Sequence, residues 1–171
     1  MGSFAIQYAK AKGAYVYTTT STSNVEWVKE LGADSVIDYK TEDYKAIVKD
    51  ADIVFDTLGK KYTTEAFAVV KNGGIVVSVV GPLDEESAKM FGMADYKLPT
   101  ELSNLVREKE AVYKFIFMHP NGSHLDEIKT LVEDDKIKPI IDKVYPISES
   151  IEAFTHLASG RAKGKIVIKI S

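Results

Sequence analysis

The sequence contains no cysteine among its 171 residues, which excludes disulfide bonds, thiolate-bound metals and cysteine nucleophiles within it. It lacks any apolar run near the ~20 residues that cross a bilayer, and it has no signal-peptide pattern. Its formal net charge is −3, so it offers no basic field to nucleic acid or to an anionic membrane surface. We expect a cytoplasmic protein that binds neither.

Histidines are few, and their spacing is not that of metal ligands. His119, His124 and His156 are scattered along the chain, whereas a zinc site needs several ligands that converge. The sequence therefore predicts no metal site. The Asn-Gly-Ser sequence at 121–123 matches a glycosylation sequon, but without a secretory signal the Asn-Gly pair is better interpreted as a turn.

Strand and helix patterns alternate along the whole chain, which is long enough for one domain. Expected strands cover 15–19, 35–38, 52–56, 75–80, 113–118 and 165–170. Expected helices cover 4–12, 25–31, 42–49, 64–70 and 125–133, followed by a helix capped by Ser148 with Ile151, Phe154 and Leu157 on its inner side. Short β-branched strands between helices predict an α/β fold with a Rossmann-type, doubly wound, mostly parallel sheet. Residues 82–110 break the rhythm and are interpreted as an insertion.

The N-terminus has the order typical of the second half of a βαβ nucleotide-binding unit. Gly2 stands at a helix start, and a strand follows that helix, but no strand precedes the glycine. In the strand order 3-2-1-4-5-6 the missing strand is central, and its loss would leave two edges ~9–10 Å apart. We therefore expect a Rossmann domain truncated at its N-terminus, either a fragment or a chain that closes the gap or borrows a strand.

Hydroxyl side chains follow the first expected strand. Residues 18–23 read Thr-Thr-Thr-Ser-Thr-Ser, where NAD-binding domains of this architecture carry an acid for the ribose 2′-hydroxyl. Such hydroxyls could donate to a 2′-phosphate instead, or they could simply form a turn that caps the next helix. Asp56 closes a buried strand, and we interpret it as an acid that caps a turn rather than a catalytic group.

Ordered motifs carry a resemblance over nearly the whole chain. They are the segments at 2–14, 31–39, 55–59, 72–77, 138–141 and 159–167. Together they resemble the C-terminal cofactor-binding domain of zinc-independent quinone oxidoreductases in the medium-chain dehydrogenase/reductase superfamily. This resemblance implies hydride transfer from NADPH to a quinone, an enone or a similar activated double bond.

The resemblance also implies a set of cofactor-binding residues and no catalytic residue. Gly2 would lie under the pyrophosphate, and Gly81 beside the nicotinamide ribose. The other implied contacts are Ser21, Thr22 and Tyr39 around the 2′-phosphate, Phe117, Met118 and His119 near the nicotinamide, and, more weakly, Lys165 at the same rim. Asn24 stands where relatives place a lysine, and the missing charge-assisted contact, typically ~1.5–3 kcal/mol, would make the NADPH preference shallow.

The resemblance further implies a GroES-like catalytic domain that these residues do not encode. We therefore expect the chain alone to be inactive and the small-molecule acceptor, a quinone or enone, to be reduced only by a longer parent. It also implies a homodimer that pairs the edge strand at 113–118. The alternative is a non-catalytic dinucleotide-binding or dimerisation module. A methyltransferase that uses S-adenosylmethionine ranks lower, because it would want an acid where this chain has Thr and Ser.

Overall fold

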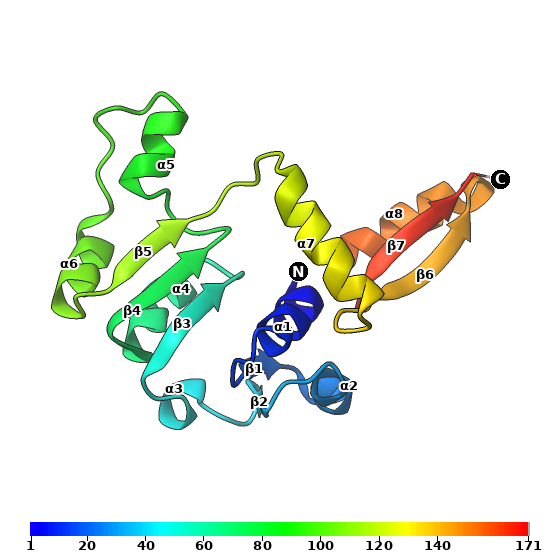
Figure 1. Cartoon of the computed structure of the whole chain (residues 1–171), viewed down its shortest axis with the longest axis horizontal. Coiled ribbons are helices and arrows are strands. Elements are labelled where there is room, and N and C mark those ends of the chain that lie inside the picture. The colour runs from blue at the N-terminus through cyan, green and yellow to red at the C-terminus, as the bar shows by residue number, and fades with distance from the viewer. Residues whose placement is uncertain (171) are drawn as a thin grey trace. The chain divides into compact units, whose positions relative to one another are not determined.

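The computed structural model describes residues 1–170, which form two compact units (Figure 1). Unit 1 consists of residues 1–40 together with the chain from residue 121 onward, and unit 2 consists of residues 41–120. All strand pairs are parallel, which confirms the predicted α/β class. Within residues 1–170, no helix combines the length and the apolar character needed to cross a membrane.

The N-terminal part of unit 1 is a helix followed by two parallel strands. Its elements are α1 (Gly2–Ala11), β1 (Tyr17–Thr20), the 3-10 helix η1 (Thr22–Asn24), α2 (Val25–Glu30) and β2 (Ser35–Asp38). Strand β1 pairs with β2 so that Thr20 stands opposite Asp38. Ile6 of α1 and Val28 of α2 are buried together with Ala33. Burial of these apolar side chains holds both helices against the strands.

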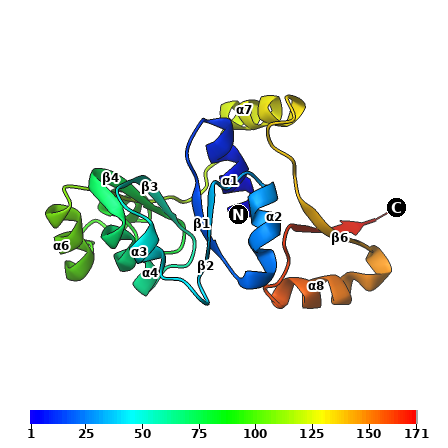
Figure 2. The same ribbon diagram turned by 90° about the horizontal axis from the view of Figure 1, so that it is seen from below.

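The C-terminal part of unit 1 contains a strand pair that the sequence only half predicted. Its elements are α7 (Gly122–Glu133), β6 (Ile141–Pro146), η3 (Ile147–Glu149), α8 (Ser150–Ala158) and β7 (Lys165–Lys169). Helix α8 lies along the parallel β6–β7 pair in both ribbon views (Figures 1 and 2). Strand β6 was not predicted.

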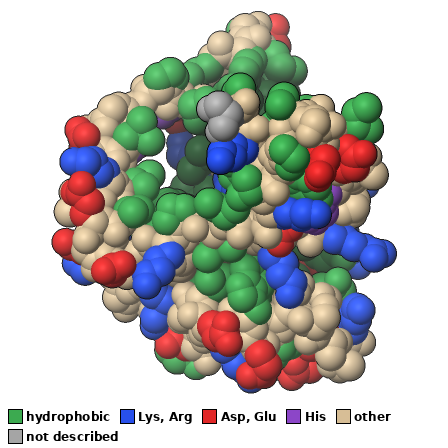
Figure 3. Space-filling view, turned by 90° about the vertical axis from the view of Figure 1, so that its right-hand side faces the viewer, with side chains coloured by type: hydrophobic (Ala, Val, Ile, Leu, Met, Phe, Trp, Pro, Cys, Tyr) green, Lys and Arg blue, Asp and Glu red, His purple; other side chains and the backbone are tan. Residues whose placement is uncertain are grey.

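Two expectations about α8 were wrong. Ser148 lies within η3, and the residue at the N-cap is Glu149, whose side chain makes no capping hydrogen bond. Ile151, Phe154 and Leu157 are exposed to 78%, 64% and 57%, because a two-stranded sheet covers only the narrow stripe around the buried Ala153. On the face drawn in Figure 3, hydrophobic side chains accordingly reach the surface among charged ones.

Unit 2 is a three-stranded parallel sheet in the order β3-β4-β5. Its elements are α3 (Tyr44–Ile47), β3 (Ala51–Asp56), α4 (Lys61–Glu65), η2 (Ala66–Ala68), β4 (Val70–Ser78), α5 (Glu85–Met90), α6 (Thr100–Glu108) and β5 (Val112–Phe115). Phe67, Val76 and Leu102 form its core with Tyr113. Because Leu102 belongs to α6, the segment at 82–110 supplies part of this core.

The described strands form three separate sheets, β1-β2, β3-β4-β5 and β6-β7. Strand β1 pairs only with β2, and β3 pairs only with β4, in the described part of the chain. Strands β1 and β3 therefore do not pair with each other within residues 1–170. Strand β5 ends at Phe115 rather than at Met118, because its partner β4 ends at Ser78, which stands opposite Phe115. The side chains of Asp84 and Ser87 bond the Phe115 N–H and C=O at 3.0 and 3.1 Å.

Candidate cofactor site

Strands β1 and β2 end side by side and bring three predicted residues to one edge of unit 1. The Tyr39 N–H donates to the Thr20 carbonyl at 3.1 Å, so the segments that follow the two strands remain adjacent. Thr22 and Tyr39 are exposed at this edge, and Ser21 is half-buried. The structure therefore brings these three predicted residues together at one edge.

A buried carboxylate at the same edge was missed. Asp38 accepts hydrogen bonds from the Thr22 hydroxyl at 2.5 Å and from the Lys40 N–H at 3.0 Å. The Thr22 hydroxyl, and then the Lys40 N–H, lower the pKa of Asp38 below its ordinary value, so the group is charged at neutral pH. The Thr22 hydroxyl is thus already engaged. An acid that ends a strand beside a Ser/Thr-rich turn was the available signal.

The Ser21 hydroxyl lies among other polar side chains. Asn24 Nδ2 donates to Ser21 Oγ at 3.3 Å, and Ser23 Oγ lies 3.4 Å from the same atom. Asn24 supplies a neutral amide here rather than a positive charge. The edge therefore offers hydroxyl and amide donors, with one anionic side chain close by.

At the start of helix α1, the Gly2 and Ser3 N–H groups make no hydrogen bond within residues 1–170, whereas the Phe4 N–H donates to the Met1 carbonyl. The N-cap residue Met1 makes no side-chain capping bond, and the first turn contains no acid. Nothing lies within 4 Å of the position that a Gly2 Cβ would occupy. The first N–H groups of a ten-residue helix, free of caps and next to open space, suit an anion such as a phosphate. The donor set of unit 1 thus fits the phosphate-bearing end of a dinucleotide.

Asp56 organises the carboxyl edge of the sheet in unit 2. Its Oδ1 accepts from the Leu58 and Gly59 N–H groups, both at 2.9 Å. Its Oδ2 accepts from Thr63 Oγ1 at 2.6 Å and from Ser78 Oγ at 2.9 Å. Burial disfavours the charged form, but these four hydrogen bonds outweigh it and hold the pKa of Asp56 below its ordinary value. The structure confirms the interpretation of Asp56 as a turn-capping acid.

Ser78 extends this network to the loop that contains Gly81. The Gly81 N–H donates to Ser78 Oγ at 2.8 Å, and the Tyr113 hydroxyl donates to the Pro82 carbonyl at 2.6 Å. Burial raises the pKa of Tyr113 to about 12, so this hydroxyl keeps its proton at neutral pH. One carboxylate therefore fixes, directly or through Ser78, the loops that follow β3 and β4.

The remaining predicted residues are more dispersed. Phe117, Met118 and His119 follow β5 and are exposed, and the Phe117 ring makes an edge contact with Phe91, with 5.3 Å between centroids. Lys165 opens β7 in unit 1, in a sheet separate from β1–β2. Ser21, Thr22 and Tyr39 thus share one edge of unit 1, whereas Lys165 does not belong to that edge.

Comparison with known proteins identifies the chain's relatives. Residues 31–168 match the family described as zinc-binding dehydrogenase. The mitochondrial NAD(P)H oxidoreductase RTN4IP1 of Mus musculus is 34% identical over 180 residues, covering 99% of this chain and 45% of that protein. The chloroplast envelope quinone oxidoreductase homolog of Arabidopsis thaliana is 29% identical, covering 99% and 49%. The quinone oxidoreductase structure from Coxiella burnetii superposes with a TM-score of 0.77 at 27% identity, covering 98% and 49%.

The chain therefore belongs to the zinc-binding dehydrogenase family and corresponds to the cofactor-binding domain of its quinone oxidoreductase-like members. This confirms the resemblance drawn from the motifs. The chain spans about half the length of the curated relatives it matches. Despite the family's description, residues 1–170 hold no group of three histidine or acidic side chains placed to bind a metal ion.

Proposed function

We propose that this chain binds NAD(P)H as the cofactor-binding part of a quinone or enone reductase. The observation that carries the proposal is the uncapped start of α1, in the same unit as the hydroxyl-lined edge at Ser21 and Thr22. The relatives support it, since their names include an NAD(P)H oxidoreductase, a quinone oxidoreductase homolog and a 2-methylene-furan-3-one reductase. A bound NAD(P)H would supply the hydride. The residues of this chain would bind and orient it.

The contacts that the resemblance implies would have different parts in holding the cofactor. In unit 1, the first N–H groups of α1 would bind the pyrophosphate, and Ser21 and Tyr39 would contact the adenosine end. In unit 2, Asp56 would hold Gly81 in place through Ser78 for the nicotinamide ribose. No residue here acts as a general acid or base in this proposal. Polarisation of the acceptor would come from the catalytic domain that the resemblance implies.

We further propose that the 171 residues bind cofactor but do not reduce an acceptor by themselves. A reductase must exclude water and hold the acceptor close to the nicotinamide. This chain spans 45% of the length of the mouse NAD(P)H oxidoreductase RTN4IP1. Calorimetric titration with NADPH, together with an assay of NADPH oxidation by a small quinone, tests both statements. Binding without acceptor-dependent oxidation is the expected result. Absence of binding would leave the alternative of a dimerisation module.

NADPH should bind more tightly than NADH, but by less than about tenfold, or ~1.4 kcal/mol. The hydroxyls around Ser21 would favour the 2′-phosphate, whereas Asp38 and the neutral Asn24 limit the gain. Asn24→Lys should widen the preference about tenfold or more, since a charge-assisted contact contributes ~1.5–3 kcal/mol. Calorimetric titration with NADPH and with NADH measures this preference. Asn72→Lys is the control, because it adds the same charge in unit 2. A tenfold preference for NADH would contradict the assignment.

We also propose a homodimer through the strand predicted at 113–118. Strand β5 is the last strand of the β3-β4-β5 sheet, and an open edge can pair with a second copy. Asp84 and Ser87 already occupy the backbone of Phe115, so pairing would be confined to residues 112–114. Small-angle scattering should give the mass of a dimer. A wild-type chain that is monomeric at every concentration would contradict the proposal.

A further inference from the structure

The Asn-Gly pair at 121–122 lies where α7 begins, and the cofactor site does not use it. The sequence suggested a turn here, but Asn121 is instead the N-cap of α7, and its side chain accepts from the His124 N–H. Gly122 is exposed, and nothing lies within 4 Å of the position of its Cβ. The Gly122 N–H makes no hydrogen bond within residues 1–170. An unbonded backbone nitrogen therefore adjoins the Asn121 carboxamide.

Hydrogen-bond donors and an imidazole surround the Asn121 carboxamide, and these groups favour nucleophilic addition to its carbon. Asn121 Oδ1 accepts from Ser123 Oγ at 2.7 Å and from the His124 N–H at 3.2 Å. Two donors on this oxygen would stabilise the negative charge that develops there when a nucleophile adds to Cγ. The imidazole Nε2 of His124 lies 3.4 Å from Asn121 Nδ2, where a departing ammonia would take up a proton.

We propose that Asn121 is a site of spontaneous deamidation, with Ser123 and His124 as its accelerating residues. The Gly122 nitrogen loses its proton to solvent and bonds to Asn121 Cγ. The Cγ–Nδ2 bond then breaks, and ammonia leaves with a proton from the imidazole or water. Water opens the resulting succinimide at either carbonyl and leaves aspartate or isoaspartate at position 121. The attack requires rotation about the Asn121 Cα–C bond, so the first turn of α7 must open before the Gly122 nitrogen reaches Cγ.

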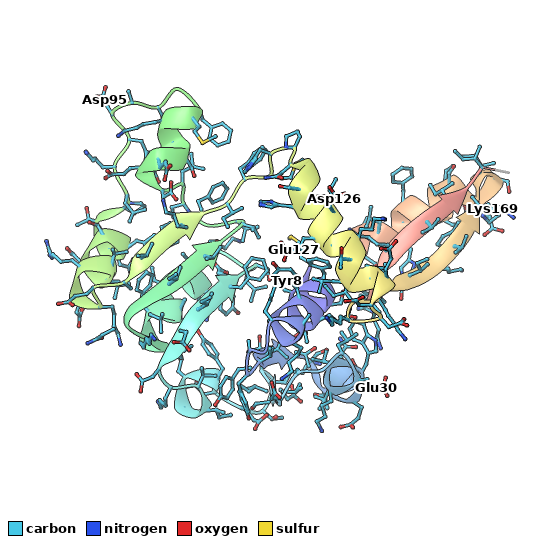
Figure 4. All side chains as sticks on the ribbon, in the orientation of Figure 1. Tyr8, Glu30, Asp95, Asp126, Glu127 and Lys169 are labelled. Atoms are coloured by element: carbon cyan, nitrogen blue, oxygen red, sulfur yellow. The ribbon has the colours of Figure 1, made fainter. Side chains whose placement is uncertain are left out.

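Conversion of Asn121 would alter the start of α7, the helix that contacts α1 through Glu127. Glu127 of α7 accepts from the Tyr8 hydroxyl at 3.0 Å (Figure 4). It also pairs with Lys12 at 2.5 Å. Aspartate at position 121 would still cap the helix. Isoaspartate would add a methylene to the backbone at the capping residue and displace the carboxylate from the His124 N–H. The first turn of α7 would then lose its cap.

The chain contains its own matched control. Asn72 and Gly73 form the same dipeptide, but the Gly73 N–H donates to the Lys109 carbonyl at 2.9 Å, and Gly73 has a φ of 72° within β4. Its nitrogen must leave a hydrogen bond before it can attack. A net hydrogen bond of ~1 kcal/mol corresponds to a rate difference of about fivefold.

The test follows both sites in one sample by peptide mass mapping, during incubation of the whole chain at neutral pH. We expect Asn121 to be converted about fivefold faster than Asn72 in the folded chain, and both to be converted at similar rates in concentrated urea. Ser123→Ala and His124→Ala should each slow the reaction at Asn121 without changing that at Asn72, with folding checked by circular dichroism. A folded chain in which Asn121 reacts no faster than Asn72, or variants that leave its rate unchanged, would overturn the proposal.

Discussion

Asp56→Ala should reduce the free energy of unfolding of unit 2 by about 3 kcal/mol or more. The substitution removes the acceptor of four hydrogen bonds, and it leaves the Thr63 and Ser78 hydroxyls without their partner. Each buried donor left unsatisfied costs ~1–3 kcal/mol. Asp56→Asn should cost less, because its amide oxygen can still accept from Leu58 and Gly59. In both variants we also expect weaker cofactor binding, since the Gly81 loop loses its support.

The measurement is hydrogen exchange on peptides from β3 to β5, together with urea unfolding followed by circular dichroism. Trp27, the single tryptophan, lies in unit 1, so its fluorescence serves as an internal reference. Asp52→Asn is the control variant, since Asp52 lies in the same strand, is exposed and pairs with Lys71. Exposed ion pairs contribute ~0–1 kcal/mol. Equal costs for Asp56→Ala and Asp52→Asn would contradict the central role of Asp56.

Acid should weaken the same network. Because the pKa of Asp56 is lower in the folded chain than its ordinary value, its contribution is fully present above that ordinary value. The contribution is lost as the pH falls through the folded pKa, when the carboxyl binds a proton. The free energy of unfolding of the Asp56→Asn variant should therefore fall less steeply with decreasing pH than that of the wild-type chain.

Gly81→Ala should destabilise unit 2 by about 1–3 kcal/mol through overpacking. A Cβ at this position would stand 2.7 Å from the Tyr113 hydroxyl oxygen, 2.8 Å from Ser78 Oγ and 3.0 Å from Thr63 Oγ1. All three atoms are held by hydrogen bonds to fixed partners, so none can move away cheaply. We also expect the loop that follows β4 to shift and cofactor affinity to fall.

A double-mutant cycle with Tyr113→Phe tests the cause. Removing the hydroxyl also removes the closest clash, so the double variant should recover part of the loss measured by exchange in unit 2. Gly2→Ala is the control, since nothing lies within 4 Å of its Cβ position, and its effect on stability should stay within about 0.5 kcal/mol. If Tyr113→Phe and Gly81→Ala are simply additive, the clash is not the source of the cost.

The short-range patterns of the sequence predicted much of the fold. Strand β2 was predicted to the residue, and β1, β3 and β7 were predicted with small shifts of their ends, because alternating β-branched residues and neighbouring turns are local signals. The inner face of α8 was predicted wrongly. Periodicity shows that a helix has an apolar side, but not whether the sheet beneath it is wide enough to cover Ile151 and Phe154.

The sequence by itself determined the parallel α/β class, the family, the hydroxyl-rich edge at Ser21 and Thr22, and the turn-capping role of Asp56. Only the tertiary structure decided that Thr22 donates to Asp38, 16 positions away, and that Asp56 reaches Ser78, 22 positions away. Those contacts depend on the registers of β1 with β2 and of β3 with β4. A parallel register is set by the packing of the crossover between two strands, which no local pattern of residues encodes.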